Sequence, residues 1–112
     1  MNKNDCLKTY ELMIMGMIEK DSLKLKESMS KNAHLIHMTG KVETRDEYIN
    51  DILDGTLNYY DYEILSFTES DVFIRLLAKV YDGDKRWWML HMKTIYLEED
   101  GKIKIKECKV GM

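Results

Sequence analysis

Residues 71–82 read DVFIRLLAKVYD, and their side chains alternate between two faces with the period of two that a β-strand imposes. One face is uniformly apolar and comprises Val72, Ile74, Leu76, Ala78 and Val80. The other face is mixed and comprises Phe73, Arg75, Leu77, Lys79 and Tyr81. We expect the apolar face to pack against helices, because an antiparallel sheet commonly buries one face and leaves the other in water.

Three more segments carry strand patterns, at residues 56–68, 86–98 and 102–110. Compact turn sequences at 82–84 and 99–101 predict that the last three strands form an antiparallel meander. The strands predicted at 56–68, 71–82 and 86–98 each exceed the usual length of about five or six residues. Strands this long in a chain of 112 residues must bend. A bent sheet with helices on its concave side tends to enclose a pocket, where small molecules bind.

The last strand changes parity along its length. Ile103 and Ile105 belong to one face, whereas Cys108 and Val110 belong to the other. We therefore predict a β-bulge near Lys106-Glu107, which would return the apolar side chains to the same face.

The first half of the chain is predicted to be largely helical. Apolar residues from Leu7 to Ile18 share one face of a helix that begins near Asn4 or Asp5. Asp21 caps a short second helix, and after a turn at 30–32 the residues 33–38 form a strand. A third helix starts at a capping box formed by Thr44 and Glu47, and it ends at Gly55.

Length and composition indicate one globular domain over residues 1–112. Hydrophobic residues make up 45% of the chain and charged residues 33%, which is typical of an ordinary globular protein. A net charge of -3 disfavours nucleic acid or an anionic membrane as the main partner. We see no signal peptide and no run long enough to span a bilayer, so we expect a cytoplasmic location with Cys6 and Cys108 reduced.

The order helix, helix, short strand, helix and long meander resembles the nuclear transport factor 2-like superfamily, in particular its SnoaL-like and ketosteroid-isomerase-like bacterial branch. The matching motifs are His37-Met38-Thr39-Gly40, Gly55-Thr56-Leu57-Asn58-Tyr59-Tyr60, Trp87-Trp88 and Glu99-Asp100-Gly101-Lys102. One departure is Gly101-Lys102-Ile103, where such proteins often have Gly-x-Trp.

This resemblance implies an α+β, cystatin-like fold. The expected architecture is a cone-shaped half-barrel made of a curved antiparallel or mixed sheet, with the three N-terminal-half helices on its concave face. Such proteins are usually dimeric through the sheet and have a pocket between sheet and helices. They include isomerases, dehydratases, cyclases and epoxide hydrolases, so the fold alone selects no reaction.

His37 is the first candidate site residue, because an imidazole near the mouth of the cone could transfer a proton at neutral pH. The alternative is a histidine that is hydrogen-bonded to the adjacent loop. His34 and His37 would point to opposite faces of a strand, so we expect no metal site. We expect no cofactor either.

Tyrosines and one glutamate complete the possible proton-transfer site. The resemblance implies a phenol that stabilises an enolate-like oxygen, and of Tyr59, Tyr60 and Tyr62 the family position is matched best by Tyr60. Glu107 is the candidate carboxylate base, if the bulge turns it inward. The alternatives are amphipathic packing for the tyrosines and strand-edge electrostatics for Glu107. We expect Tyr48 and Tyr62 to contact a ligand.

The two tryptophans face opposite ways. Parity with Leu90 and Met92 places Trp88 in the pocket. The outer face then carries an aromatic patch of Phe73, Tyr81, Trp87, Met89 and His91, which suits a two-fold homodimer interface. If the parity is reversed, His91 becomes a pocket residue instead.

Three functions remain open at this point. The first is the binding of an apolar or aromatic small molecule in the pocket. The second is an isomerase or dehydratase activity that uses His37 or Glu107 as base and Tyr60 as oxyanion donor. The third is self-association through the outer sheet face. The residue pattern does not decide whether the protein is an enzyme.

Overall fold

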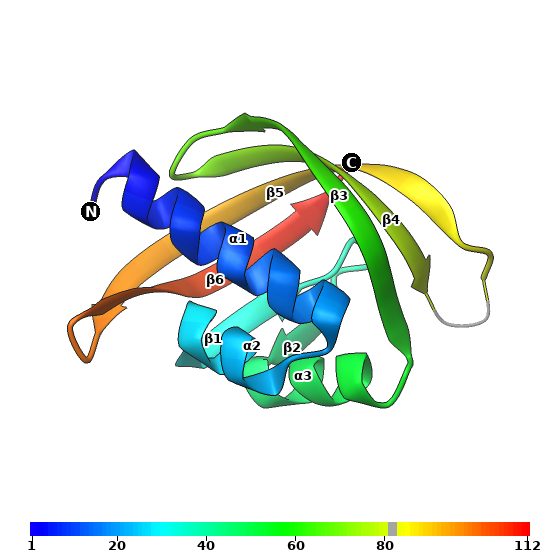
Figure 1. The fold of residues 1–112 in the computed structure, drawn as a ribbon, viewed down its shortest axis with the longest axis horizontal. Coiled ribbons are helices and arrows are strands. Elements are labelled where there is room, and N and C mark those ends of the chain that lie inside the picture. Colours follow the sequence, from blue (N-terminus) through cyan, green and yellow to red (C-terminus); the bar gives the residue numbers. More distant parts are fainter. Residues whose placement is uncertain (81–82) are drawn as a thin grey trace.

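The computed structural model describes residues 1–80 and 83–112. The described residues form the helices α1 (Lys3–Glu19), α2 (Ser22–Ser28) and α3 (Arg45–Leu53). They also form the strands β1 (Met29–Ile36), β2 (Val42–Thr44), β3 (Leu57–Phe67), β4 (Asp71–Val80), β5 (Arg86–Glu99) and β6 (Lys102–Gly111). In Figure 1, α1 crosses the sheet, and α2 and α3 lie together beside β1 and β2.

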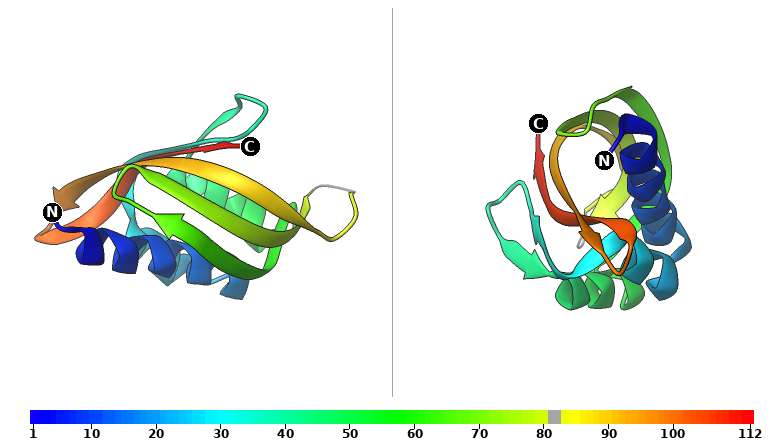
Figure 2. Two further views of the ribbon diagram at one scale, coloured as in Figure 1. Left: turned by 90° about the horizontal axis from the view of Figure 1, so that it is seen from above. Right: turned by 90° about the vertical axis from the view of Figure 1, so that its left-hand side faces the viewer.

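The strands form one mixed sheet in the order β2-β1-β6-β5-β4-β3. Strand β1 pairs parallel to β6, and the other neighbours pair antiparallel. Figure 2 shows that the sheet is strongly curved and that the helices lie on its concave side. The predicted α+β half-barrel is therefore confirmed, and the parallel pair makes the sheet mixed.

Local capping signals set the helix boundaries. Asn2 accepts a hydrogen bond from the Asp5 N–H at 2.9 Å at the start of α1, and Asp21 accepts two backbone N–H bonds at the start of α2. At α3, the Thr44 hydroxyl accepts from the Glu47 N–H while the Glu47 carboxylate accepts from the Thr44 N–H. These bonds satisfy N–H groups that a helix start leaves unpaired, and the predicted capping box is confirmed.

The sheet confirms the parity of the meander. Val72, Ile74, Leu76 and Ala78 are buried on β4, and the side chain of Val80 lies outside the described residues. Between β5 and β6 the pairs Ile95–Glu107 and Tyr96–Ile105 leave Lys106 as an extra residue. This bulge lies where it was predicted. Ile105 and Cys108 are both fully buried because the extra residue restores the phase.

One segment differs from the prediction. Residues 30–32 were expected to form a turn, but β1 already begins at Met29. The pairing with β6 is irregular between Met29 and His34, so polar residues lie there in extended backbone. The buried Ser30 hydroxyl donates to the Glu99 carboxylate at 2.6 Å, and this long-range contact replaces the expected turn.

Candidate functional site: an apolar cavity at the open end of the sheet

The concave face of the sheet and the helices surround a cavity of about 480 Å³. This volume lies within the range of about 300–1,000 Å³ that is typical of small-molecule sites. Its inner wall is buried and apolar, with Met13, Met17, Leu76, Leu90 and Met92 as examples. Exposed residues from the 37–39 and 83–86 segments form its mouth.

A histidine–glutamate pair lies at one side of the cavity. His37 lines the cavity, and its Nε2 is hydrogen-bonded to Oε1 of Glu43, whose side chain is only 4% exposed. The turn after β1 holds His37 in place, since its N–H donates to the Lys41 carbonyl at 2.9 Å and its carbonyl accepts from the Gly40 N–H at 2.8 Å. The backbone thus directs the imidazole toward β2.

Burial controls the charge of this pair. Desolvation raises the pKa of Glu43, and a hydrogen bond with the Asp51 carboxyl raises it further, while His37 acts in the opposite direction. An ionised Glu43 accepts from the Nε2–H of His37, and the second ring nitrogen is then an acceptor. A histidine held in one tautomer is suited to proton transfer.

Two tyrosine hydroxyls lie beside this pair. The Tyr48 hydroxyl, on α3, donates to the Tyr59 hydroxyl, on β3, at 3.1 Å, and both side chains line the cavity. The rings of His37 and Tyr48 have centroids 5.9 Å apart. Burial raises the pKa of Tyr48 well above its usual value, so this phenol stays protonated and remains a hydrogen-bond donor at neutral pH.

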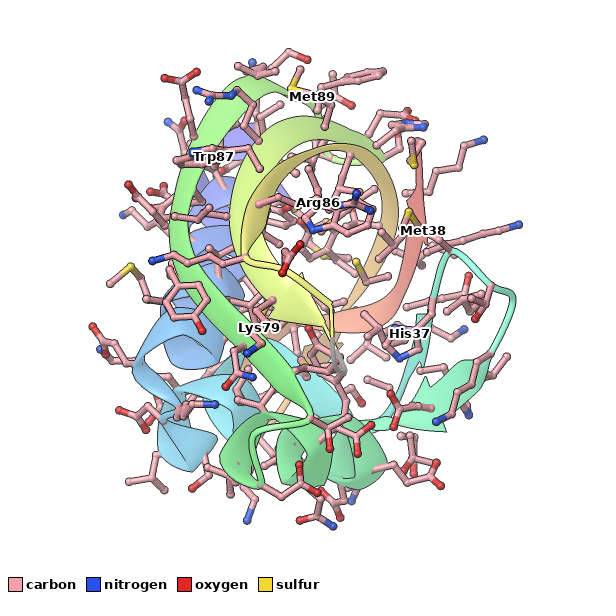
Figure 3. The ribbon with its side chains drawn as sticks, turned by 90° about the vertical axis from the view of Figure 1, so that its right-hand side faces the viewer. His37, Met38, Lys79, Arg86, Trp87 and Met89 are labelled. Carbon is pink, nitrogen blue, oxygen red and sulfur yellow. The ribbon has the colours of Figure 1, made fainter. Side chains whose placement is uncertain are left out.

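The opposite side of the mouth carries an arginine stacked on a tryptophan. The Arg86 guanidinium lies 3.7 Å from the ring centroid of Trp88, and both residues line the cavity. Figure 3 shows Arg86 at the open end of the curved sheet, with His37 at the rim. The Nε1–H of Trp88 is buried and finds no hydrogen-bond acceptor in residues 1–80 and 83–112.

Burial keeps the cysteine in the cavity wall in its thiol form. Cys108 is fully buried, its Sγ lies 3.8 Å from Sδ of Met92, and burial raises the pKa of its thiol to about 12. At neutral pH it is therefore a thiol and a poor nucleophile. Both cysteines are free and buried.

Three of the predicted site residues line the cavity: His37, Tyr48 and Trp88. The inward placement of Tyr60 is wrong, because its side chain is 42% exposed and lies outside, under the Lys85 ammonium at 4.2 Å. The pairs Tyr59–Ala78 and Asp61–Leu77 leave Tyr60 as the extra residue of a bulge. This bulge places Tyr59 in the cavity, one position earlier than predicted.

Tyr62 and Glu107 also lie away from the cavity. Tyr62 is half-buried against the core, and burial together with the nearby Glu11 carboxylate raises its pKa. Glu107 is half-buried and pairs with His34 on β1 and Ile95 on β5. The bulge at Lys106 places Ile105 and Cys108 on the same buried face of the sheet, so the Glu107 side chain lies on the outer face.

The sequence reasoning missed Glu43 and Arg86. Glu43 lies on a three-residue strand, which is too short to show a periodic signal. Arg86 begins β5 and lies on the same face of the strand as Trp88, so the alternation of the strand could have predicted its position beside the mouth.

The outer face of the sheet has the predicted parity. Phe73, Trp87 and Met89 are 47%, 41% and 57% exposed, and the ring of His91 stacks on Phe73 with a centroid distance of 4.5 Å. His91 also hydrogen-bonds the Asp71 carboxylate at 2.8 Å, so it lies outside the cavity. Tyr81, the fifth predicted member of this patch, lies outside the described residues.

Residues 1–80 and 83–112 contain no group of three His, Cys, Asp or Glu side chains placed to hold a metal ion. In the same residues, no helix has the length and apolar character needed to cross a membrane.

Solved structures with the same architecture identify the fold. A protein of unknown function from Prochlorococcus marinus, described as NTF2-like (nuclear transport factor 2-like), superposes with a TM-score of 0.75 at 14% identity, covering 96% of this chain and 90% of that one. The chain has the nuclear transport factor 2-like fold. An uncharacterised protein with a cystatin-like fold from Caulobacter vibrioides also matches, with a TM-score of 0.68, 8% identity and coverage of 96% and 87%.

One similar structure is an enzyme. A type 2 hexachlorocyclohexane dehydrochlorinase superposes with a TM-score of 0.70 at 11% identity, covering 97% of this chain and 83% of that one. Comparison with models of protein families and with curated proteins found no match. Superpositions at identities this low establish the nuclear transport factor 2-like fold but no function. Membership of the SnoaL-like and ketosteroid-isomerase-like branch stays a prediction.

Proposed function

We propose that this protein binds an apolar or aromatic small molecule in the cavity at the open end of the sheet. The observation that carries the proposal is the cavity itself, with about 480 Å³ behind a mouth of exposed residues and an inner wall of buried apolar side chains. Transfer of an apolar molecule from water into such a site is favourable by about 25 cal/mol for each Å² buried.

The chemistry of the wall suits ligands of more than one shape. Met13, Met17 and Met92 are unbranched and adapt to irregular surfaces, whereas Trp88 offers a flat aromatic face. The hydroxyls of Tyr48 and Tyr59 and the imidazole of His37 are the polar groups that would orient a ligand.

A neutral fluorescent dye tests the proposal directly. N-phenyl-1-naphthylamine should bind and gain fluorescence, and Ala78→Phe should abolish the gain because Ala78 is buried and lines the cavity. Met89→Phe is the matched control, since Met89 points away from the cavity on the outer face (Figure 3) and is 57% exposed. Equal dye binding by both variants would place the dye elsewhere and refute the proposal.

The His37–Glu43 pair favours a second candidate function, proton abstraction from a bound ligand. The cavity holds an imidazole at its rim, oriented by a buried carboxyl group, and two phenols are close to it. A dehydrochlorinase with the same fold shows that this architecture supports an enzyme. In this candidate function Glu43 orients His37, and the hydroxyl of Tyr48 or Tyr59, in place of that of Tyr60, would stabilise the oxyanion.

A generic substrate separates this function from simple binding. 5-Nitrobenzisoxazole opens its ring when a base removes one proton, so it reports any base placed in an apolar site. We expect His37→Gln to lose the catalysed rate and His34→Gln to retain it, because His34 is exposed on β1 and does not line the cavity. A wild-type rate no faster than that with free imidazole would remove this candidate.

A second copy of the chain is the proposed partner of the outer face. The patch of Phe73, Trp87, Met89 and His91 is contiguous across β4 and β5, where Phe73 pairs with His91 and Arg75 with Met89. Arg75 lies 4.4 Å from the Trp87 ring centroid and 3.7 Å from Glu63, so a cation borders the apolar surface. Burial of this surface against a copy of itself would remove exposed apolar area from water.

A further inference from the structure

The mouth of the cavity contains a cation, Arg86, whose side-chain donors have no partner among residues 1–80 and 83–112. The chain has three arginines, and two of them lie beside carboxylates: Arg45 beside Asp46 at 3.1 Å and Arg75 beside Glu63 at 3.7 Å. Within the described part of the chain, Arg86 has no ion pair and no side-chain hydrogen bond, and its one described side-chain interaction is the stack on Trp88.

This stack fixes the guanidinium without consuming its donors. A guanidinium that lies over an aromatic ring uses its face, whereas its five N–H groups point outward in its own plane. The ring beneath it belongs to Trp88, which is part of the cavity wall. Arg86 is therefore held at the mouth with an edge available for a planar anion, and carboxylates match that edge with two parallel hydrogen bonds.

A second donor lies in the same wall. The Nε1–H of Trp88 is buried and has no acceptor in residues 1–80 and 83–112. This donor is buried away from the open space of the cavity, so a ligand would reach it only after the Trp88 side chain moved, and the carboxylate is assigned to Arg86 alone.

Among the described residues, one opposing charge lines the mouth. Asp84 also lines the mouth, but it is exposed and forms no ion pair with Arg86. Unlike Arg86, it is not stacked on a part of the cavity wall in the described structure. The better-positioned charge is the positive one.

We propose that the ligand is an apolar or aromatic carboxylic acid, whose hydrophobic body fills the cavity and whose carboxylate binds Arg86 on Trp88 at the mouth. This inference rests on the proposed binding function and adds the charge of the ligand to it. A neutral ligand would leave the Arg86 edge unpaired, and an amine would place two cations together.

The test compares three ligands that have the same alkyl chain and different head groups. Decanoic acid, decan-1-ol and decylamine compete with N-phenyl-1-naphthylamine at neutral pH, each below its aggregation limit. We expect the acid to bind at least about tenfold more tightly than the alcohol, which is the usual scale of a charge-assisted bidentate contact. The amine should bind most weakly.

Two variants assign this preference to the mouth. Arg86→Gln should make the acid and the alcohol bind alike, each measured against the dye affinity of that variant, and Arg86→Lys should keep only part of the preference because an ammonium lacks the planar edge. Asp84→Asn should strengthen binding of the acid by removing the nearby negative charge. Arg86 is exposed, so these variants should fold, and circular dichroism checks this.

The outcomes distinguish the inference from the function on which it rests. If the alcohol or the amine binds as tightly as the acid, or if the preference survives in Arg86→Gln, the carboxylate assignment is wrong and the apolar site stands. If dye binding is insensitive to Ala78→Phe, the proposed binding function and the carboxylate assignment are both wrong.

Discussion

Replacement of Glu43 by Gln tests the electrostatics of the candidate site. Glu43 is 4% exposed and is hydrogen-bonded to His37, and burial together with a hydrogen bond to Asp51 raises its pKa. Gln has the same shape and stays neutral at every pH. The difference in unfolding free energy between the two proteins therefore isolates the ionisation of Glu43.

The sign follows from the raised pKa of Glu43, whose ordinary value is 4.5. Below pH 4.5, the Glu43 carboxyl is protonated in both the folded and the unfolded chain, and its full contribution to the unfolding free energy is present. As the pH rises through the folded pKa, the unfolded chain has already lost the proton, so stability falls. The slope for one group is at most about 1.4 kcal/mol per pH unit.

Urea denaturation of both proteins between pH 4 and pH 8 measures this difference. We expect the advantage of wild type over Glu43→Gln to shrink as the pH rises above 4.5 and then to level off, while groups common to both proteins cancel. Comparing Glu43 with Glu43→Gln in proteins that also carry His37→Gln removes the coupling between this carboxyl and the imidazole. An advantage that grows with pH would show that Glu43 is a stabilised anion and would refute the reasoning.

Three further predictions concern the helices, the cavity wall and the outer face. Gly16→Ala should lower the unfolding free energy by about 1–2 kcal/mol, because overpacking outweighs the gain in helix propensity: the new Cβ would lie 2.9 Å from Cγ and 3.1 Å from the backbone nitrogen of Leu25. Urea titration decides this, and a more stable variant would contradict it. Cys108, with a thiol pKa of about 12, should resist iodoacetamide at pH 8 until urea unfolds the protein, as peptide mass spectrometry would show, and rapid native alkylation would disprove its burial. Trp87→Ala should convert a dimer to monomer in sedimentation, and a monomeric wild type would exclude the interface.

Local patterns predicted much of the fold because their signals are complete within a few residues. The capping box of Thr44 and Glu47 involves one turn of helix, and the parity change between Ile105 and Cys108 marks the bulge at Lys106. The same parity argument placed Trp88 in the cavity and His91 outside it. The β3 bulge has no comparable signal, because Tyr59 and Tyr60 are chemically alike and either could face inward.

The amino-acid sequence by itself determined the order of the elements, the buried face of the meander and the presence of a curved sheet over helices, since periodicity and capping act between near neighbours. Only the tertiary structure decided the site. Glu43 reaches His37 because the 37–41 turn folds β2 back onto β1, and Tyr48 reaches Tyr59 because α3 packs beneath β3. Such contacts join segments that are brought together only by the complete fold, and no pattern confined to neighbouring residues encodes them.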